Sequence, residues 1–178
     1  MDFYQLVEER QSCRSYDSSR EIPQEKLNRI IEVARLAPSA CNSQPWHFIT
    51  VTNPTNRVKV TDALTSMGMN KWASQATAFI VIVQESPNFT ARLGGWIKNK
   101  HFPLIDCGIA ASHITLAATA EGLGSCILGW FNEKQLRNIL QIPRSKRILM
   151  VVSLGYPLDN HRQHIRKPLS DISSTEKY

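Results

Sequence analysis

Apolar residues recur at three- and four-residue intervals in the segment that follows Pro23. This spacing places them on one face of a helix, which can then be buried against the rest of the protein. Proline is favoured in the first turn of a helix and breaks its interior, so Pro23 suits the start of this element and Pro38 its end. The pattern predicts an amphipathic helix from about Pro23 to Ala37. Its apolar positions are Leu27, Ile30, Ile31, Ala34 and Ala37.

Three short runs rich in β-branched residues indicate strands. They are residues 47–52 (HFITVT), 78–84 (AFIVIVQ) and 147–155 (RILMVVSLG), each flanked by turn residues or charges. The segment 103–122 (PLIDCGIAASHITLAATAEG) is apolar on almost every side and rich in small residues. It predicts a central helix that packs closely against several neighbours.

Helices that alternate with strands favour, by themselves, a doubly wound parallel sheet. A nucleotide-binding domain of that kind carries GxGxxG after its first strand, but residues 53–60 (NPTNRVKV) contain no glycine. The phosphate-loop motif GxxxxGK followed by Ser or Thr is also absent from the sequence. A phosphate-bearing ligand is therefore expected to be held by side chains.

Composition and charge narrow the class of protein only in part. The length of 178 residues and hydrophobic content of 42% fit one globular domain. The formal charge of +6 suits phosphate-bearing ligands or nucleic acid without choosing between them. We expect no secretory signal, because charged and apolar residues alternate near the N-terminus, and no membrane span. The four cysteines are far apart and form no CxxC motif, so we expect free thiols and a cytoplasmic chain. They are Cys13, Cys41, Cys107 and Cys126.

The segment RQSCRSY, residues 10–16, is the best candidate for holding an anion. If it is extended, Arg10, Ser12 and Arg14 share one face, so that two guanidinium groups and a hydroxyl converge. Such groups form strong, charge-assisted hydrogen bonds with phosphate. The alternative is that the arginines are solvated at a helix end, where exposed carbonyl groups favour cations. The segment by itself leaves both interpretations open.

A second polar segment, APSACNSQPWHF, spans residues 37–48. Pro38 and Pro45 restrict the backbone on both sides of Ser39, Asn42 and Gln44, whose side chains donate and accept hydrogen bonds. A rigid loop of this kind suits a planar heterocycle. The alternative is ordinary turn chemistry, in which these side chains satisfy only nearby backbone groups.

Taken in order, the motifs resemble the FMN-dependent nitroreductase family over nearly the whole chain. They are RQSCRSY, LAPSACNSQPWHF, AEGLGSCILGWF, VSLGYP and HIRKP. The resemblance implies an α+β fold, a nitroreductase-like sandwich with a largely antiparallel sheet, in place of the doubly wound fold. It also implies one domain over residues 1–178 and an intertwined homodimer with FMN at its interface. Residues 156–178 are then a C-terminal extension that reaches the partner subunit.

The resemblance also implies which residues contact the cofactor. Those of the first motif hold the ribityl chain and phosphate, and the basic pair near the C-terminus returns to the phosphate. The segment 38–40 is presented to the isoalloxazine by the partner subunit. Backbone amides of the turn at 122–123 lie near flavin N5 and O4, and no side chain is catalytic. The expected cofactor-binding residues are Arg10, Gln11, Ser12, Arg14, Pro38, Ser39, Ala40, Asn42, Gln44, Lys71, Gly122, Leu123, Gly124, Arg166 and Lys167.

The function implied is that of an oxidoreductase. NADH or NADPH would reduce FMN, which would then reduce nitroaromatic, quinone or similar flat acceptors in a ping-pong cycle. The segment 85–102 resembles the variable lid of the family, where Phe89, Trp96 and Phe102 could cover the flavin. Aromatic residues on a loop can equally serve to attach it to the core.

Other classes of function stay open or are disfavoured. The family scaffold also carries specialised chemistry, such as reductive dehalogenation or flavin destruction. A non-catalytic flavin- or nucleic-acid-binding protein would fit the charge, but no aromatic residues interleave with the basic tail, so we expect no nucleic-acid partner. His161 and His164 form an HxxH pair in cationic surroundings, and we expect no metal site there.

Overall fold

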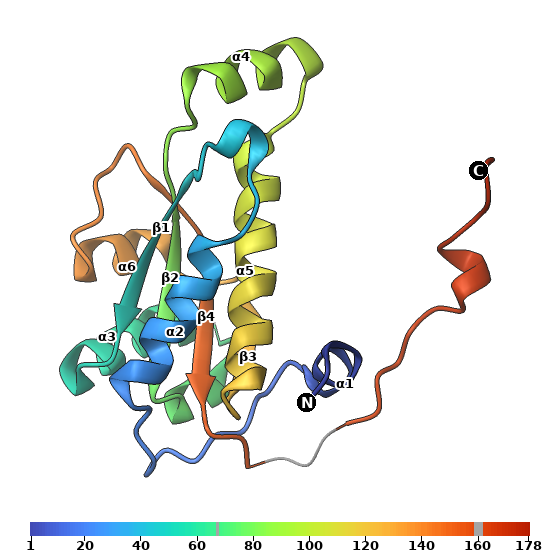
Figure 1. Cartoon of the computed structure of the whole chain (residues 1–178). Coiled ribbons are helices and arrows are strands. Elements are labelled where there is room, and N and C mark those ends of the chain that lie inside the picture. The colour runs from blue at the N-terminus through green and yellow to red at the C-terminus, as the bar shows by residue number, and fades with distance from the viewer. Residues whose placement is uncertain (67, 159–161) are drawn as a thin grey trace.

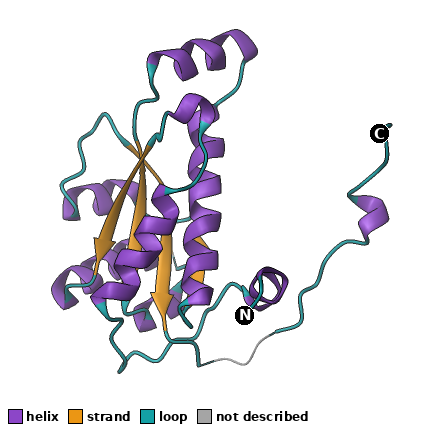
Figure 2. Cartoon of the chain, in the orientation of Figure 1, coloured by secondary structure: helices purple, strands orange, loops and turns teal. Residues whose placement is uncertain are grey.

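The computed structural model describes residues 1–66, 68–158 and 162–178, and its centre is one four-stranded sheet. Strand order is β1-β2-β4-β3, and each neighbouring pair is antiparallel. Figure 2 shows the strands enclosed by helices. The α+β prediction with an antiparallel sheet is confirmed, and a doubly wound parallel sheet is excluded. The strands are β1 (Trp46–Val51), β2 (Ala78–Gln84), β3 (Gly124–Leu128) and β4 (Arg147–Gly155).

Strand β2 divides the core into two layers, because alternate side chains of a strand point to opposite faces. Phe79 and Val81 join one buried cluster with residues of α3 (Pro54–Thr65) and α6 (Glu133–Ile139). Ile80 and Ile82 join the other cluster with residues of α2 (Gln24–Arg35) and α5 (Phe102–Ala120). The fold is therefore a three-layer sandwich of helices, sheet and helices.

Helix α5 is the central helix that the sequence predicts. Among the described residues it is the one helix long and apolar enough to cross a membrane by length and composition. Much of it packs against β2, β4 and α2, as expected of a core helix in a folded domain. One stripe stays exposed, however. It contains Leu104, Ile105, Gly108, Ser112 and Ala120.

The local predictions are correct where the pattern is strong. Strands β2 and β4 have the predicted bounds of 78–84 and 147–155. Strand β1 begins one residue before its predicted start, and α2 ends at Arg35, whereas the predicted helix ended at Ala37. The prediction of a loop over 85–102 is wrong, because α4 (Phe89–Lys98) occupies most of it. The Asn88 side chain caps this helix, accepting a hydrogen bond from the Ala91 N–H at 2.9 Å.

The two ends of the chain lie outside the sandwich. Helix α1 (Phe3–Glu9) and the segment after it run beside the C-terminal end of α5 (Figure 1). Residues 162–178 form an arm that leaves the body of the protein and carries the short turn η3 (Leu169–Asp171). The apolar side chains of Ile165, Leu169 and Ile172 on this arm are 92%, 75% and 65% exposed. Such an arm has apolar surface to bury elsewhere.

Candidate functional site

The segment after α1 is extended, as the phosphate-binding hypothesis requires. Ser12 forms a parallel bridge with Ser125 at the start of β3, and the Cys13 N–H donates to the Ser125 carbonyl at 2.9 Å. Cys13 is buried against the core, whereas Ser12 and Arg14 are exposed on the opposite side. The alternation expected of an extended chain is therefore present.

The basic residues of this segment meet the C-terminal arm. Arg10, Ser12 and Arg14 line a cavity of about 280 Å³ together with Gln11 and residues 162–166. The Gln11 Oε1 accepts a hydrogen bond from the Arg162 backbone N–H at 3.0 Å, which connects the arm to the segment. Arg166 belongs to the cavity lining, whereas Lys167 is exposed and outside it. Two guanidinium groups and a hydroxyl from one segment thus line the same cavity as two arginines of the arm, Arg162 and Arg166.

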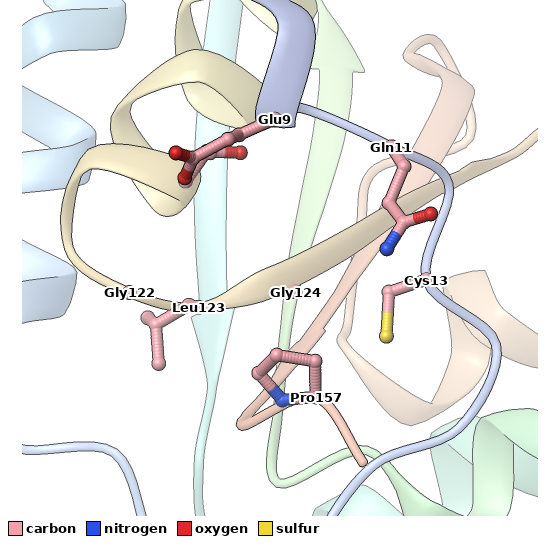
Figure 3. Close-up of a pocket in the computed structure, with 8 residues that line it drawn as sticks. Glu9, Gln11, Cys13, Gly122, Leu123, Gly124 and Pro157 are labelled. Atoms are coloured by element: carbon pink, nitrogen blue, oxygen red, sulfur yellow. The ribbon is translucent and has the colours of Figure 1, made fainter. Parts of the chain in front are cut away.

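A second cavity, of about 380 Å³, adjoins the first through Gln11. Figure 3 shows Gln11 and Cys13 extending from the N-terminal segment toward the start of β3, with the ring of Pro157 beside Gly124. The turn at Gly122 and Leu123 completes the wall. Three of the predicted positions, Gly122, Leu123 and Gly124, are therefore brought next to Gln11.

The turn at Gly122 has the conformation expected of a helix end. Gly122 is left-handed, with φ of 73°, which residues other than glycine rarely adopt. Its N–H donates to the Thr119 carbonyl at 2.9 Å, and the Leu123 N–H donates to the Ala118 carbonyl at 2.8 Å. This is the Schellman arrangement that closes a helix. Both amides already have acceptors inside the helix cap, so any hydrogen bond from them to a ligand must be shared with these carbonyl groups.

Two basic side chains of α2 bind Glu121, the residue just before this turn. The Arg29 Nε and Nη2 donate to the two carboxylate oxygens of Glu121 at 2.6 and 2.8 Å. The Lys26 ammonium donates to the Glu121 backbone carbonyl. The hydrogen bond from Arg29 lowers the pKa of Glu121 below its ordinary value, so the carboxylate stays charged. This ion pair fixes the residue just before Gly122, and the sequence patterns did not predict it.

The Cys126 thiol lies beside the phosphate-binding candidates without being a nucleophile. Burial raises its pKa, an effect that Arg14 and Ser12 only partly oppose. A thiol with a raised pKa is protonated at neutral pH and is a poor nucleophile.

Lys71 lies on the 3₁₀ helix η2 (Lys71–Gln75), which is attached to the N-terminal segment. The Tyr16 backbone N–H donates to the Gln75 Oε1 at 3.0 Å, and the rings of Tyr16 and Trp72 have centroids 6.2 Å apart. Lys71 is exposed. It is thus on an element fixed next to residues 10–16, although it lines neither of the two cavities.

The loop 38–44 lies at the other end of α5. Asp106 in the first turns of α5 accepts a hydrogen bond from the Ala40 N–H at 3.2 Å, and Cys107 donates to the Pro45 carbonyl at 3.3 Å. The Gly122 turn follows the last residue of this 19-residue helix. At a rise of roughly 1.5 Å per residue, the two ends are about 28 Å apart. In Figure 1, the loop before β1 and helix α1 lie at opposite ends of α5, so one chain does not bring all predicted site residues together.

Within the loop, several polar side chains satisfy one another. Ser39 Oγ accepts a hydrogen bond from the Gln44 N–H at 2.9 Å, and Gln44 Nε2 donates to the Asn42 carbonyl at 3.0 Å. Turn chemistry therefore accounts for part of the role of Ser39 and Gln44. Pro38 and the Asn42 side chain are exposed on the surface of the loop.

Helix α4 stands beside this loop and borders a larger cleft, of about 660 Å³. The cleft is basic and partly aromatic, since its lining includes Arg92, Trp96, Lys100, His101 and Arg147 and no acidic residue. The Trp96 side chain is 82% exposed. The sequence patterns pointed to aromatic residues here but missed the helix that carries them.

No metal site is found in the described part of the chain, where no three His, Cys, Asp or Glu residues gather in a suitable group. His161, one half of the HxxH pair, lies outside the described residues.

Comparisons with known proteins agree with this fold and arrangement. A protein of Archaeoglobus fulgidus, provisionally named NADH dehydrogenase/NAD(P)H nitroreductase, is 36% identical over 158 residues, which cover 86% of this chain and 84% of the relative. The FMN reductase (NAD(P)H) of Bacillus subtilis is 27% identical over 94% of this chain and 70% of its own length. A nitroreductase family protein of Clostridium difficile has a TM-score of 0.82 at 27% identity, with full coverage of both chains. Residues 7–156 match the nitroreductase family, and this protein therefore belongs to that family.

Proposed function

We propose that this protein is an FMN-dependent NAD(P)H oxidoreductase that reduces nitroaromatic, quinone or similar flat acceptors. The observation that carries the proposal is the basic cavity formed by Arg10, Ser12, Arg14 and Arg166. The family match and relatives named NAD(P)H nitroreductase and FMN reductase support it.

The residues present fit FMN on chemical grounds. Guanidinium groups and a hydroxyl are suitable donors for a terminal phosphate. The lining of the adjoining cavity includes Leu123, Gly124 and Pro157 and one charged residue, Glu9. It is therefore less charged than the first cavity, which suits a ribityl chain and a ring edge. Bound FMN would supply hydride transfer at its N5 atom, and the protein supplies binding, orientation and exclusion of competing reactions.

We further propose that the working unit is a homodimer. The loop 38–44 and the segment 10–14 lie at opposite ends of α5, so a second copy with α5 reversed is needed to bring them to one flavin. The exposed stripe at Leu104, Ile105 and Gly108 offers a surface for that contact. The arm 162–178, with its exposed apolar side chains, is then the extension that reaches the partner.

Donor and acceptor are proposed to use one site in turn. The chain contains no glycine-rich dinucleotide-binding motif, so no second nucleotide site separates NAD(P)H from the acceptor. Helix α4 of the partner subunit would border the space in which they alternate. All four cysteines lie in the described residues, and none of them forms a disulfide bond. Because free thiols are typical of reducing compartments, this supports a cytoplasmic location.

The purified protein itself provides the test. It should be yellow with bound FMN, lose that colour when NADH or NADPH is added under anaerobic conditions, and regain it with a nitro compound. A protein that binds FMN but is not reduced would point to a non-catalytic role. A colourless protein that shifts DNA in a gel would instead support nucleic-acid binding and contradict the proposal.

A further inference from the structure

The loop 39–44 has a strained backbone. Cys41, Asn42 and Gln44 have φ of 51°, 50° and 48°, in the left-handed region, which asparagine tolerates but cysteine and glutamine rarely adopt. Three such residues within four positions keep this conformation only where surrounding contacts impose it. The contacts that impose it therefore determine the shape of the loop that is expected to face a flavin.

Helix α5 supplies one of these contacts. Asp106 is 3% exposed, and its Oδ1 accepts the hydrogen bond from the Ala40 N–H at 3.2 Å. Among the described residues, its Oδ2 has no hydrogen-bond partner. One end of the loop is thus anchored to the central helix by a buried carboxylate.

Asn88 supplies the other anchor through its side-chain nitrogen and its backbone N–H. Its Nδ2 donates to the Cys41 carbonyl at 3.0 Å, and its backbone N–H donates to Ser43 Oγ at 2.8 Å. Its Oδ1 accepts from the Ala91 N–H at 2.9 Å and so caps α4. Asparagine combines a donor nitrogen and an acceptor oxygen in one side chain, whereas an ionised aspartate only accepts hydrogen bonds.

Helix α4 presents aromatic surface directly after this anchor. Phe89 and Trp96 are 69% and 82% exposed, and the Arg92 guanidinium carbon lies 5.9 Å from the centre of the Phe89 ring. Exposed aromatic rings on one short helix suit stacking against a flat, electron-poor acceptor.

We propose that Asn88 is a positioning residue that joins the flavin-contacting loop to the acceptor-contacting helix, so that the two binding events are coupled. The proposal rests on the function proposed above. Movement of α4 on acceptor binding acts on Cys41 and Ser43 through the bonds of Asn88. Loss of these bonds loosens the strained loop and weakens both FMN and acceptor binding.

The test compares Asn88→Asp with Asn132→Asp. Aspartate at 88 keeps the cap on α4 but cannot donate to the Cys41 carbonyl. Asn132 caps α6 by accepting from the Gln135 N–H at 3.0 Å, away from the loop, so its variant controls for the exchange itself. Ser43→Ala removes the second bond without touching the cap.

Expected effects follow from the loss of one or two hydrogen bonds. Asn88→Asp should raise the Kd of FMN and the KM of a nitro acceptor roughly threefold to tenfold. The kcat at saturating FMN and acceptor should change less, because the reacting groups are unaltered. Ser43→Ala should act in the same direction, and the double variant should show less than the sum of both effects. Asn132→Asp should leave both constants at the wild-type values.

Hydrogen exchange in the flavin-free protein gives an independent measurement. Asn88→Asp should speed exchange of the Ala40 and Gln44 amides and leave the Ala91 amide protected. Unchanged exchange, together with wild-type Kd and KM, overturns the proposal even if the enzyme is active. Equal effects of Asn132→Asp overturn it as well, because the negative charge that the Asn-to-Asp exchange adds at a helix cap would then explain the data. A wild-type protein that binds no FMN refutes the proposed function, and the exchange data then decide whether Asn88 holds the loop.

Discussion

Gly124 and Cys13 are packed so closely that no side chain fits between them. A Cβ atom added at Gly124 would lie 2.7 Å from Cys13 Sγ and 2.8 Å from Cys13 Cβ. Because Cys13 is buried beside the Ser12–Ser125 bridge, this contact sets how the N-terminal segment lies against β3. The position of the phosphate-binding candidates thus depends on the absence of a side chain at 124.

Gly124→Ala should therefore destabilise the fold and weaken FMN binding. Overpacking in a closed core costs about 1–3 kcal/mol, measured as the free energy of unfolding in denaturant. Gly129→Ala is the matched control, since no atom lies within 4 Å of a Cβ at that position. If Gly124→Ala keeps wild-type stability and flavin content, the N-terminal segment shifts without a cost in free energy, and this prediction is wrong.

Arg14→Ala should weaken FMN binding by roughly 1.5 to 3 kcal/mol, because a charge-assisted hydrogen bond to the phosphate is lost. The Kd measured by flavin fluorescence would rise by one to two orders of magnitude. Arg144→Ala, on an exposed turn, removes the same charge far from the cavity and should have little effect. A normal flavin content after dialysis would exclude Arg14 from the site.

Ile105→Asp should both separate the subunits of the proposed dimer and release FMN. Ile105 is 53% exposed on the uncovered stripe of α5, where a carboxylate in an apolar interface would be unpaired. The wild-type dimer is expected to bury well over ~2,000 Å² and to sediment as a dimer. Val58 is 63% exposed on α3, so Val58→Asp controls for the added charge. A folded monomer of the wild type that keeps FMN would contradict this arrangement.

Steady-state kinetics should show parallel double-reciprocal lines when NAD(P)H and acceptor are both varied. Parallel lines are expected because the donor must leave before the acceptor enters the shared site. Each substrate should also inhibit competitively against the other at high concentration. Intersecting lines would require both to be bound at once, which a single shared site does not allow.

Local patterns in the sequence were sufficient for several elements. The β-branched runs of β2 and β4 and the three-and-four spacing of α2 are signals that neighbouring residues carry by themselves. Strand β3 was missed because it is short and begins with Gly124 and Ser125. Helix α4 was missed because Phe89–Lys98 contains two glycines, and its clearest signal is the capping residue Asn88.

The amino-acid sequence was sufficient to predict the chemical character of the candidate site: basic and hydroxyl side chains at 10–14, a polar loop between two prolines, and a glycine turn after the central helix. How these parts lie relative to one another became known from the three-dimensional structure. The loop and the basic segment lie at opposite ends of α5, and the loop is hydrogen-bonded to Asp106 and Asn88. The amides of Gly122 and Leu123 donate hydrogen bonds inside the helix cap. These relationships depend on packing between residues far apart in the chain, which local periodicity does not encode.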